Sequence, residues 1–228
     1  MDRFEWIATA AFGLEGVVAR ELARLGLDAK AENGGARFSG TFEDAFRANL
    51  HARCADRILL VMGRFEARSF EELFEGVRAL PWEDFIGEHT RFPVNGKCAR
   101  SQLMSVRDCQ SITKKAIVER LRGRYRTDWF VEDAETVSID VALHGDIAQL
   151  TLDASGTALN RRGYRTWNGE APLRETLAAA LVTLSPWRPG MPLHDPMCGT
   201  GTLMIEAAMR MAHRAPGLTR ELDRKSVV

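Results

Sequence analysis

Hydrophobic and polar residues along the chain follow two periods, and each change of period marks the boundary of a predicted element. Residues 4–10 alternate as a strand does, whereas apolar residues over 14–25 recur with helical spacing. Asn33–Gly35 has the composition of a tight hairpin turn. Up to residue 66 the pattern predicts a strand, a helix, two strands, a helix and a strand, over residues 4–10, 14–25, 29–31, 36–39, 42–50 and 57–65.

This element order is that of a ferredoxin-like unit, which we assign to residues 1–66. A second α+β unit follows over residues 67–153. Its predicted helices and strands span residues 70–80, 91–98, 106–122, 136–143 and 147–152. The α+β class therefore covers the chain as far as residue 153.

From residue 154 to residue 222 the pattern changes to the start of an α/β domain. Pro172 occupies the position of a first helical residue, ahead of an apolar helix face over residues 173–184. Residues 192–194 are predicted to end a short apolar strand, and residues 203–211 to form an apolar helix after a glycine-rich turn. A strand, a turn and a helix in this order open a Rossmann-like domain.

The glycine-rich turn is the most informative segment, and its residues are Asp195, Pro196, Met197, Cys198, Gly199, Thr200, Gly201 and Thr202. Glycines allow a ligand to approach the backbone, and the following helix offers unpaired N–H groups; we expect the two threonines to cap that helix. A phosphate-binding P-loop would need a lysine where Gly201 stands, so triphosphate chemistry is not favoured. A β–α turn without a ligand is the alternative interpretation.

Composition narrows the class of protein. The 228 residues are 45% hydrophobic, which is ample for a buried core, and no apolar run is long enough to span a membrane. The four cysteines form no CxxC pair, so neither a zinc site nor a disulfide framework is predicted. With no signal peptide at the N-terminus, we expect a cytoplasmic protein without a bound metal.

The net charge of zero hides an uneven distribution along the chain. Residues 1–96 carry a net charge of −4, whereas residues 97–126 carry nine basic and two acidic side chains, a net charge of +7. Residues 127–154 carry seven acidic side chains and no lysine or arginine. A basic segment of this density favours a polyanionic partner, provided that folding gathers its charges on one surface.

The predicted helix over residues 106–122 gathers those charges on one side. Its cations fall within about a third of the circumference, and they are Arg107, Lys114, Lys115 and Arg122. Apolar residues fall opposite, and they are Cys109, Ile112 and Ala116. Further donors precede the helix, namely Lys97, Arg100, Ser101 and Gln102. This stripe is typical of phosphate recognition on structured RNA, and a solvated helix face is the alternative.

Two segments before the glycine-rich turn, Leu159–Arg165 and Ala171–Val182, complete a set of three separated blocks. Together the blocks resemble the bacterial THUMP-domain class I S-adenosylmethionine-dependent RNA methyltransferases. The resemblance is strongest from Lys114 to Leu218. It implies a THUMP RNA-binding domain at residues 67–153 and the methylation of a guanine exocyclic amine in 23S ribosomal RNA, with S-adenosylmethionine as the cofactor.

The same resemblance implies the cofactor contacts. Asp195 would orient the amino group of the cofactor, and Gly199 and Gly201 would let the backbone approach it. The complete set of implied cofactor contacts is Asp195, Pro196, Met197, Cys198, Gly199, Thr200, Gly201, Ala171 and Pro172. For Ala171 and Pro172, a helix start that serves packing alone is the alternative.

Arg161 and Arg162 lie next to the entry of the predicted methyltransferase domain. They are interpreted either as an RNA clamp between domains or as partners in interdomain salt bridges.

The sequence contains no Asn/Asp-Pro-Pro-Tyr motif, which in amine methyltransferases binds the amine and stacks on the base. We therefore assign no catalytic residue. Residues 223–228 leave the family pattern and match one reading frame of a sequencing adapter, so we expect a non-native tail on a chain truncated at its C-terminus. We expect this fragment to be inactive alone. The alternative functions are a non-enzymatic THUMP RNA-binding module and a THUMP-linked RNA sulfur-transfer enzyme, and the oligomeric state is open.

Overall fold

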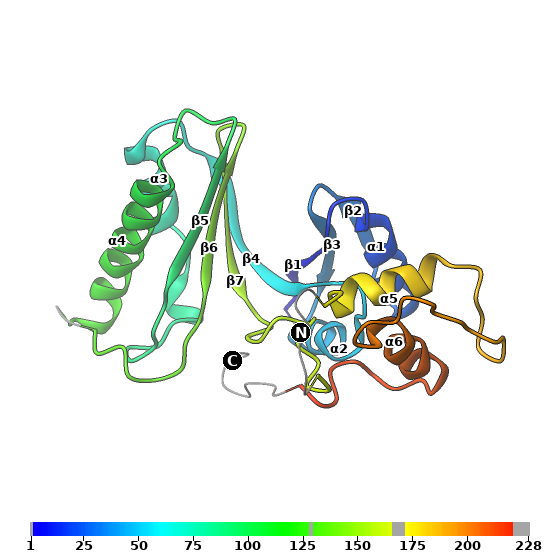
Figure 1. Cartoon of the computed structure of the whole chain (residues 1–228). Helices are drawn as coiled ribbons and strands as arrows, with labels where there is room; N and C mark the ends of the chain where they lie inside the picture. The colour runs from blue at the N-terminus through cyan, green and yellow to red at the C-terminus, as the bar shows by residue number, and fades with distance from the viewer. Residues whose placement is uncertain (1, 128–129, 166–171, 221–228) are drawn as a thin grey trace. The chain divides into compact units, whose positions relative to one another are not determined.

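The computed structural model describes residues 2–127, 130–165 and 172–220, which form two compact units (Figure 1). The first unit combines the residues up to Leu59 with those from Thr157 onward, and the second spans Leu60–Gly156. The elements of the first unit are β1 (Phe4–Thr9), α1 (Glu15–Arg24), β2 (Ala29–Glu32), β3 (Gly35–Gly40), α2 (Phe42–His51), the beginning of β4 (Arg57–Glu66), α5 (Glu175–Leu184) and α6 (Thr202–Met211). The second unit contains the rest of β4, α3 (Phe70–Arg78), η1 (Trp82–Asp84), β5 (Val94–Ala99), α4 (Val106–Tyr125), β6 (Ile139–His144) and β7 (Ile147–Asp153).

The strands of the first unit lie in the order β2-β3-β1-β4, and β3 is antiparallel to both β1 and β2. With α1 and α2 between the strands in sequence, this is the ferredoxin-like unit that the pattern of residues 4–65 predicts. Its core contains Trp6, Leu22, Phe38 and Ile58, none more than 2% exposed. The indole N–H of Trp6 donates to the Gly40 carbonyl oxygen over 3.0 Å, so this buried ring leaves no unpaired donor.

Local signals fix the ends of several elements. Thr41 and Asp44 form a capping box at the start of α2, and Ser69 and Glu72 form another at the start of α3. In the turn between β2 and β3, Gly34 has a φ of 87°, the left-handed region that side chains other than glycine rarely adopt. These caps and this turn are encoded within a few residues, which explains why the sequence predicts the element order.

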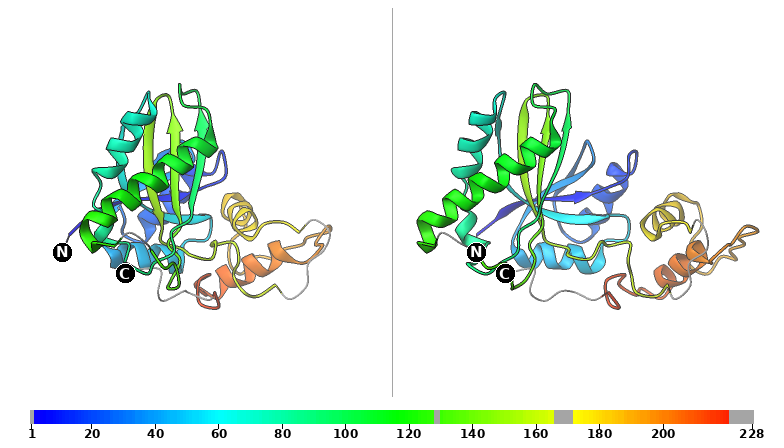
Figure 2. Two further views of the ribbon diagram at one scale, coloured as in Figure 1. Left: turned by 90° about the vertical axis from the view of Figure 1, so that its left-hand side faces the viewer. Right: turned by 60° about the vertical axis from the view of Figure 1, so that its left-hand side comes forward.

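The strands of the second unit lie in the order β4-β7-β6-β5, with β6 antiparallel to β7 and parallel to β5. Helices α3 and α4 pack against each other on one face of these strands (Figure 2). The core beneath them is fully buried and contains Leu73, Trp82, Phe92, Ile117 and Ile139. One side of α4 is therefore committed to packing, and the opposite side is exposed.

Two predicted strands differ from the structure. The strand expected over residues 91–98 begins at Val94, because Pro93 has no N–H for the ladder and Arg91 makes only an isolated bridge. Residues 192–194, the expected end of a strand, form no strand at all. A parallel strand needs neighbours, and within residues 172–220 the structure has none.

The described residues contain no helix that is both long and apolar enough to cross a membrane. The same residues contain no group of three or more His, Cys, Asp or Glu side chains that could hold a metal ion.

Candidate functional site

The turn from Asp195 to Gly201 leads into α6 and is largely exposed. Its start is shaped by a hydrogen bond of 3.0 Å, which the Met197 N–H donates to Asp195 Oδ1. Gly199 and Gly201 have φ values of 52° and 73°, where glycine is favoured. A Cβ atom on Gly201 would meet nothing within 4 Å, so the backbone faces open space that a ligand can enter. We call residues Asp195–Gly201 the cofactor turn, after the contacts that the sequence predicts there.

Helix α6 begins without a side-chain cap. Its N-cap is Gly201, and the first helical hydrogen bond runs from the Ile205 N–H to the Gly201 carbonyl oxygen over 2.9 Å. Thr200 and Thr202 hydrogen-bond to each other through their hydroxyl groups over 3.0 Å, so the prediction that they cap this helix is wrong. The N–H groups of the first turn, with the positive end of the helix dipole, are directed toward the cofactor turn.

Arg165 links the cofactor turn to the start of α5. Its Nε donates to Glu175 Oε1 over 2.9 Å, and its Nη2 donates to the Leu173 carbonyl oxygen over 2.9 Å and to Thr202 Oγ1 over 3.1 Å. The Arg165 and Glu175 side chains are 15% and 8% exposed. One guanidinium therefore joins the first residue of α6 to the residues that open α5.

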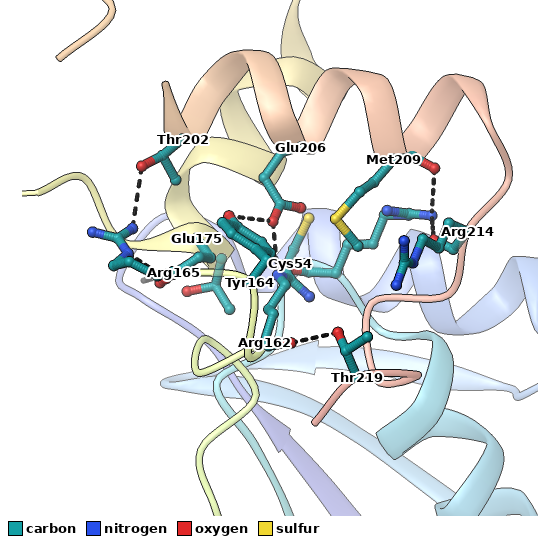
Figure 3. Close-up of polar contacts among 12 residues, drawn as sticks. Cys54, Arg162, Tyr164, Arg165, Glu175, Thr202, Glu206, Met209, Arg214 and Thr219 are labelled. Atoms are coloured by element: carbon teal, nitrogen blue, oxygen red, sulfur yellow. Dashed lines mark hydrogen bonds and ion pairs between the residues drawn. The ribbon is translucent and has the colours of Figure 1, made fainter. Parts of the chain in front are cut away.

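A cluster of polar side chains lies below α6 in Figure 3; Arg162 and Glu206 are buried, and Arg53 and Tyr164 are half-buried. Arg162 Nε lies 2.8 Å from Glu206 Oε1, and both side chains are 1% exposed; the contact is an ion pair without the alignment of a hydrogen bond. The Tyr164 hydroxyl donates to the same carboxylate oxygen over 2.9 Å, and Arg162 Nη2 donates to the Arg53 carbonyl oxygen over 2.6 Å. We call Arg53, Arg162, Tyr164 and Glu206 the buried cluster.

Electrostatics in the buried cluster follow from burial. Desolvation raises the pKa of the Glu206 carboxyl, and the Arg162 charge opposes that rise. Desolvation also lowers the pKa of the Arg53 guanidinium, although Arg53 keeps hydrogen bonds to the Arg214 and Met209 carbonyl oxygens at the end of α6. Because Arg53 follows α2 and the other members follow residue 160, the cluster ties the ferredoxin-like elements to α6 within one unit.

This arrangement corrects one predicted RNA contact. Arg162 is paired with Glu206 inside the core, so its guanidinium is not available to a phosphate; because both residues lie within the predicted domain 154–222, the pair is not the interdomain salt bridge of the alternative either. Arg161, by contrast, is exposed. The two neighbouring arginines therefore have different roles.

The start of α5 also differs from the prediction. The helix begins at Glu175 with Arg174 as its N-cap, three residues after Pro172. The Leu173 carbonyl oxygen accepts from Arg165 instead of from a helical N–H, which holds this segment outside the helix. Pro172 is exposed beside the start of α5, and Ala171 lies outside the described residues.

The α4 surface in the second unit displays the predicted cations. Arg107, Lys115 and Arg122 are exposed, whereas Lys114 is half-buried. Lys114 Nζ lies 2.7 Å from Glu132 Oε1 and 5.0 Å from the centre of the Phe92 ring, so part of its charge is already neutralised. The core face of the helix, as observed, contains Cys109, Thr113, Ala116, Ile117 and Leu121.

The donors before α4 are held by the turn between β6 and β7. The Gln102 backbone N–H donates to Asp146 Oδ1 over 2.6 Å, and the Asp146 N–H donates to Ser101 Oγ over 3.0 Å. Lys97 and Arg100 are exposed, and Arg100 has a φ of 52°. The structure thus orders this loop beside α4, with lysine and arginine side chains rather than Ser101 and Gln102 available to a partner.

Sequence reasoning missed Arg165, Tyr164 and Glu206 as parts of the site. Glu206 carries a usable signal, because it is the only acidic residue within the apolar run of α6. A lone carboxylate on an apolar face needs a buried cation, and the arginine-rich segment Leu159–Arg165 could supply one. Which arginine would be buried is decided by tertiary packing and not by local pattern.

Three family models match consecutive parts of the chain. Residues 5–59 match the RlmL ferredoxin-like domain, residues 67–153 match the THUMP domain, and residues 162–226 match the RMKL-like methyltransferase domain.

Two curated relatives are similar over nearly the whole chain. YpsC of Bacillus subtilis, named as a candidate RNA methyltransferase, is 47% identical over 97% of this chain and 58% of its own length. The ribosomal RNA large subunit methyltransferase K/L of Photobacterium profundum is 38% identical over 95% of this chain and 31% of its own length. The chain therefore spans a little over half of the first relative and about a third of the second.

Solved structures show the same fold. A protein from Listeria monocytogenes, named as a predicted N6-adenine-specific DNA methylase, matches with a TM-score of 0.95 and 47% identity, over 100% of this chain and 60% of that one. SMU.472, named as a candidate methyltransferase and solved with SAH, matches with a TM-score of 0.93 and 43% identity, over 100% of this chain and 60% of that one.

Proposed function

The chain belongs to the family of THUMP-domain RNA methyltransferases, and from this premise we propose that the full-length protein transfers a methyl group from S-adenosylmethionine to the exocyclic amine of a guanine in 23S ribosomal RNA. The observation that supports this most is the cofactor turn, where two glycines with positive φ leave the backbone open ahead of α6. The turn occurs in the same chain as a THUMP domain with exposed cations.

The residues of the cofactor turn fit S-adenosylmethionine. Asp195 is half exposed and offers a carboxylate to an amino or hydroxyl group, and the glycines leave room where a Cβ atom would stand. The uncapped start of α6 offers N–H donors and a positive partial charge to a carboxylate. When bound, the cofactor supplies a methyl group activated on a sulfonium sulfur.

On the RNA side, we propose contacts from the exposed cations of the α4 surface and the loop before it, namely Lys97, Arg100, Arg107, Lys115 and Arg122, with a smaller contribution from Lys114. Such contacts recognise the phosphate backbone, so they position structured RNA without reading its sequence. Choice of the target nucleotide then belongs to residues near the cofactor turn.

The acceptor in this proposal is an amine nitrogen whose lone pair is conjugated with the base. Such a nitrogen is a weak nucleophile, so holding it in line with the methyl group supplies much of the rate. The names of the relatives give two acceptors, a ribosomal RNA in one and an adenine of DNA in another. Both adenine N6 and guanine N2 are exocyclic amines, and the THUMP domain favours RNA.

The test is a methyl-transfer assay with the full-length protein on unmodified 23S ribosomal RNA and, separately, on DNA. We expect N2-methylguanosine in the digested RNA, measured by mass spectrometry of nucleosides, and no product in DNA. N6-methyladenine in DNA without RNA product would contradict the proposal, and RNA binding without methylation of either substrate would favour a binding module.

Two variants test the assignment of the cofactor turn. Asp195→Ala removes a polar contact, and Gly199→Val places a β-branched residue at positive φ with a strain of about 1–3 kcal/mol. Made in the full-length protein, both variants should abolish cofactor binding in calorimetry while leaving RNA affinity unchanged. Loss of RNA affinity together with cofactor binding would show that the turn serves folding instead.

We also propose that the 228-residue chain alone binds S-adenosylmethionine weakly and transfers no methyl group. A Rossmann-type site lies across the carboxyl ends of several parallel strands, and residues 172–220 contain no strand. Micromolar binding by this chain in calorimetry would show that the site lies elsewhere.

A further inference from the structure

A cavity of about 720 Å³ lies in the first unit, between the segment after Thr157, the start of α5 and the segment after α6. Four arginines line it, Arg161, Arg165, Arg174 and Arg220, and Glu175 is the one carboxylate among the described lining residues. None of the residues from Asp195 to Gly201 lines it, so the cavity is separate from the cofactor turn.

The charges of the lining do not cancel. Glu175 neutralises Arg165, with 2.9 Å between Nε and Oε1. Arg174 lies 3.3 Å from an Asp56 carboxylate oxygen, but its side chain is 60% exposed, so this pair is weak. Arg161 is exposed and makes no ion pair with any described residue. The cavity therefore presents cationic side chains that can reach a ligand.

The backbone adds to this charge. Leu173, Arg174 and Glu175 line the cavity at the start of α5, whose N-cap residue makes no side-chain cap hydrogen bond. N–H groups of the first helical turn and the positive end of the helix dipole favour an anion here. Arginine forks and helix N–H groups are together the usual ligands of a phosphate group.

Arg165 connects the cavity with the cofactor turn, because it lines the one and donates to Thr202 Oγ1 beside the other. The cavity and the start of α6 therefore share one guanidinium. Enzymes that modify a base extrude the target nucleotide from its stack, and backbone phosphates fix where that nucleotide lies.

We propose that this cavity binds a phosphate group of the RNA substrate close to the target nucleotide, with Arg161 and Arg174 as the direct ligands. The proposal rests on the proposed function, because that function supplies the RNA. It adds a phosphate site in the first unit to the one proposed on the α4 surface of the second unit. Arg165 and Arg220 hold the walls, since each donates to a backbone carbonyl oxygen, Leu173 and Thr157 respectively.

The first experiment measures binding of a structured 23S RNA fragment to the 228-residue chain at several salt concentrations. The double variant Arg161→Gln/Arg174→Gln should lower affinity about tenfold, as expected for charge-assisted hydrogen bonds. The plot of log affinity against log salt concentration should become shallower by roughly one to two. The matched control is Arg20→Gln/Arg24→Gln, which removes two exposed charges from α1 in the same unit and should leave affinity unchanged. Equal losses in both double variants would reduce the effect to net charge and overturn the proposal.

A second measurement does not depend on variants. An arginine-specific dicarbonyl reagent, read by mass spectrometry, should modify Arg161 and Arg174 more slowly when RNA is bound, while Arg20 and Arg24 react at one rate throughout. Equal rates at Arg161 and Arg174 with and without RNA would overturn the proposal. Protection by inorganic phosphate but not by RNA would assign the cavity to a free anion, which also overturns it.

Failure of this inference and failure of the proposed function give different results. If Lys115→Ala weakens RNA binding and the cavity variants do not, the cavity assignment falls and the RNA methyltransferase assignment stands. If the cavity variants weaken RNA binding but the full-length protein methylates neither RNA nor DNA, the phosphate site stands and the proposed activity falls.

Discussion

The buried cluster of the first unit and the α4 surface of the second contain the same kinds of cation in opposite environments. Arg162 and Glu206 are each 1% exposed and 2.8 Å apart, whereas Arg122 and Glu119 on α4 are 45% and 49% exposed and 3.6 Å apart. A buried pair cannot exchange its partner for water, but an exposed cation can exchange a carboxylate for a phosphate. Arginine is thus paired inside the core in the buried cluster and remains available for binding on the α4 surface.

The largest expected effect follows from breaking the buried pair. Arg162→Met leaves Glu206 buried without the cation it contacts and should lower the free energy of unfolding by about 3–5 kcal/mol. Urea denaturation measures this loss. The matched control is Arg122→Met on α4, where an exposed pair contributes no more than about 1 kcal/mol. A similar loss in both variants would remove the distinction between the two regions.

A smaller effect is expected in RNA binding, where the α4 surface should dominate. Lys115→Ala should weaken binding several-fold for unrelated RNA hairpins and make the salt dependence shallower by about one phosphate contact. Lys114→Ala should change both quantities less, because Glu132 and the Phe92 ring already engage its charge. Fluorescence anisotropy at several salt concentrations measures both. If neither lysine mattered, the stripe would be a solvated helix face.

The smallest effect concerns pH, where the two regions should show opposite signs. The Arg120 guanidinium lowers the pKa of the Glu83 carboxyl, so that pair adds stability above the ordinary value of 4.5, and the gain disappears as pH falls through the lowered pKa. Burial raises the pKa of Glu206, so its contribution is present below 4.5 and declines as pH rises through the raised pKa.

Urea midpoints of Glu83→Gln and Glu206→Gln relative to the unmodified chain, between about pH 3 and about pH 7, test this contrast. As pH rises, the stability of the unmodified chain should increase relative to Glu83→Gln, by less than about 1 kcal/mol. Its stability should decrease relative to Glu206→Gln. If both stability differences changed with pH in the same direction, the Arg162 charge would have a larger effect on the pKa of Glu206 than burial has.

Sequence predicts local features of this fold well, because they are encoded locally. The hairpin at Asn33–Gly35 and the capping box at Thr41 each depend on residues within a few positions. The strand predicted at 192–194 does not form, because strand pairing depends on residues far away in the sequence. The predicted start of α5 is wrong because Arg165, ten residues before Glu175, donates a hydrogen bond to the Leu173 carbonyl oxygen.

The candidate site divides in the same way. The cofactor turn is recognisable from its two glycines, and both adopt positive φ. The sequence could not predict that Arg161 is exposed and Arg162 buried, because the two arginines are adjacent. They differ only in the residues that contact them in the folded protein. Glu206 settles that choice, and it stands more than forty positions later in the chain.

The first unit is discontinuous, and this sets a schedule for its assembly on the ribosome. Arg53 is synthesised early, but roughly 110 further residues must be added before Arg162 appears and roughly 150 before Glu206 appears. At about 5–20 residues per second, the longer interval is about 8–30 s. For that time Arg53 lacks the Met209 and Arg214 carbonyl oxygens that later accept its hydrogen bonds, so water solvates its guanidinium until those residues are synthesised.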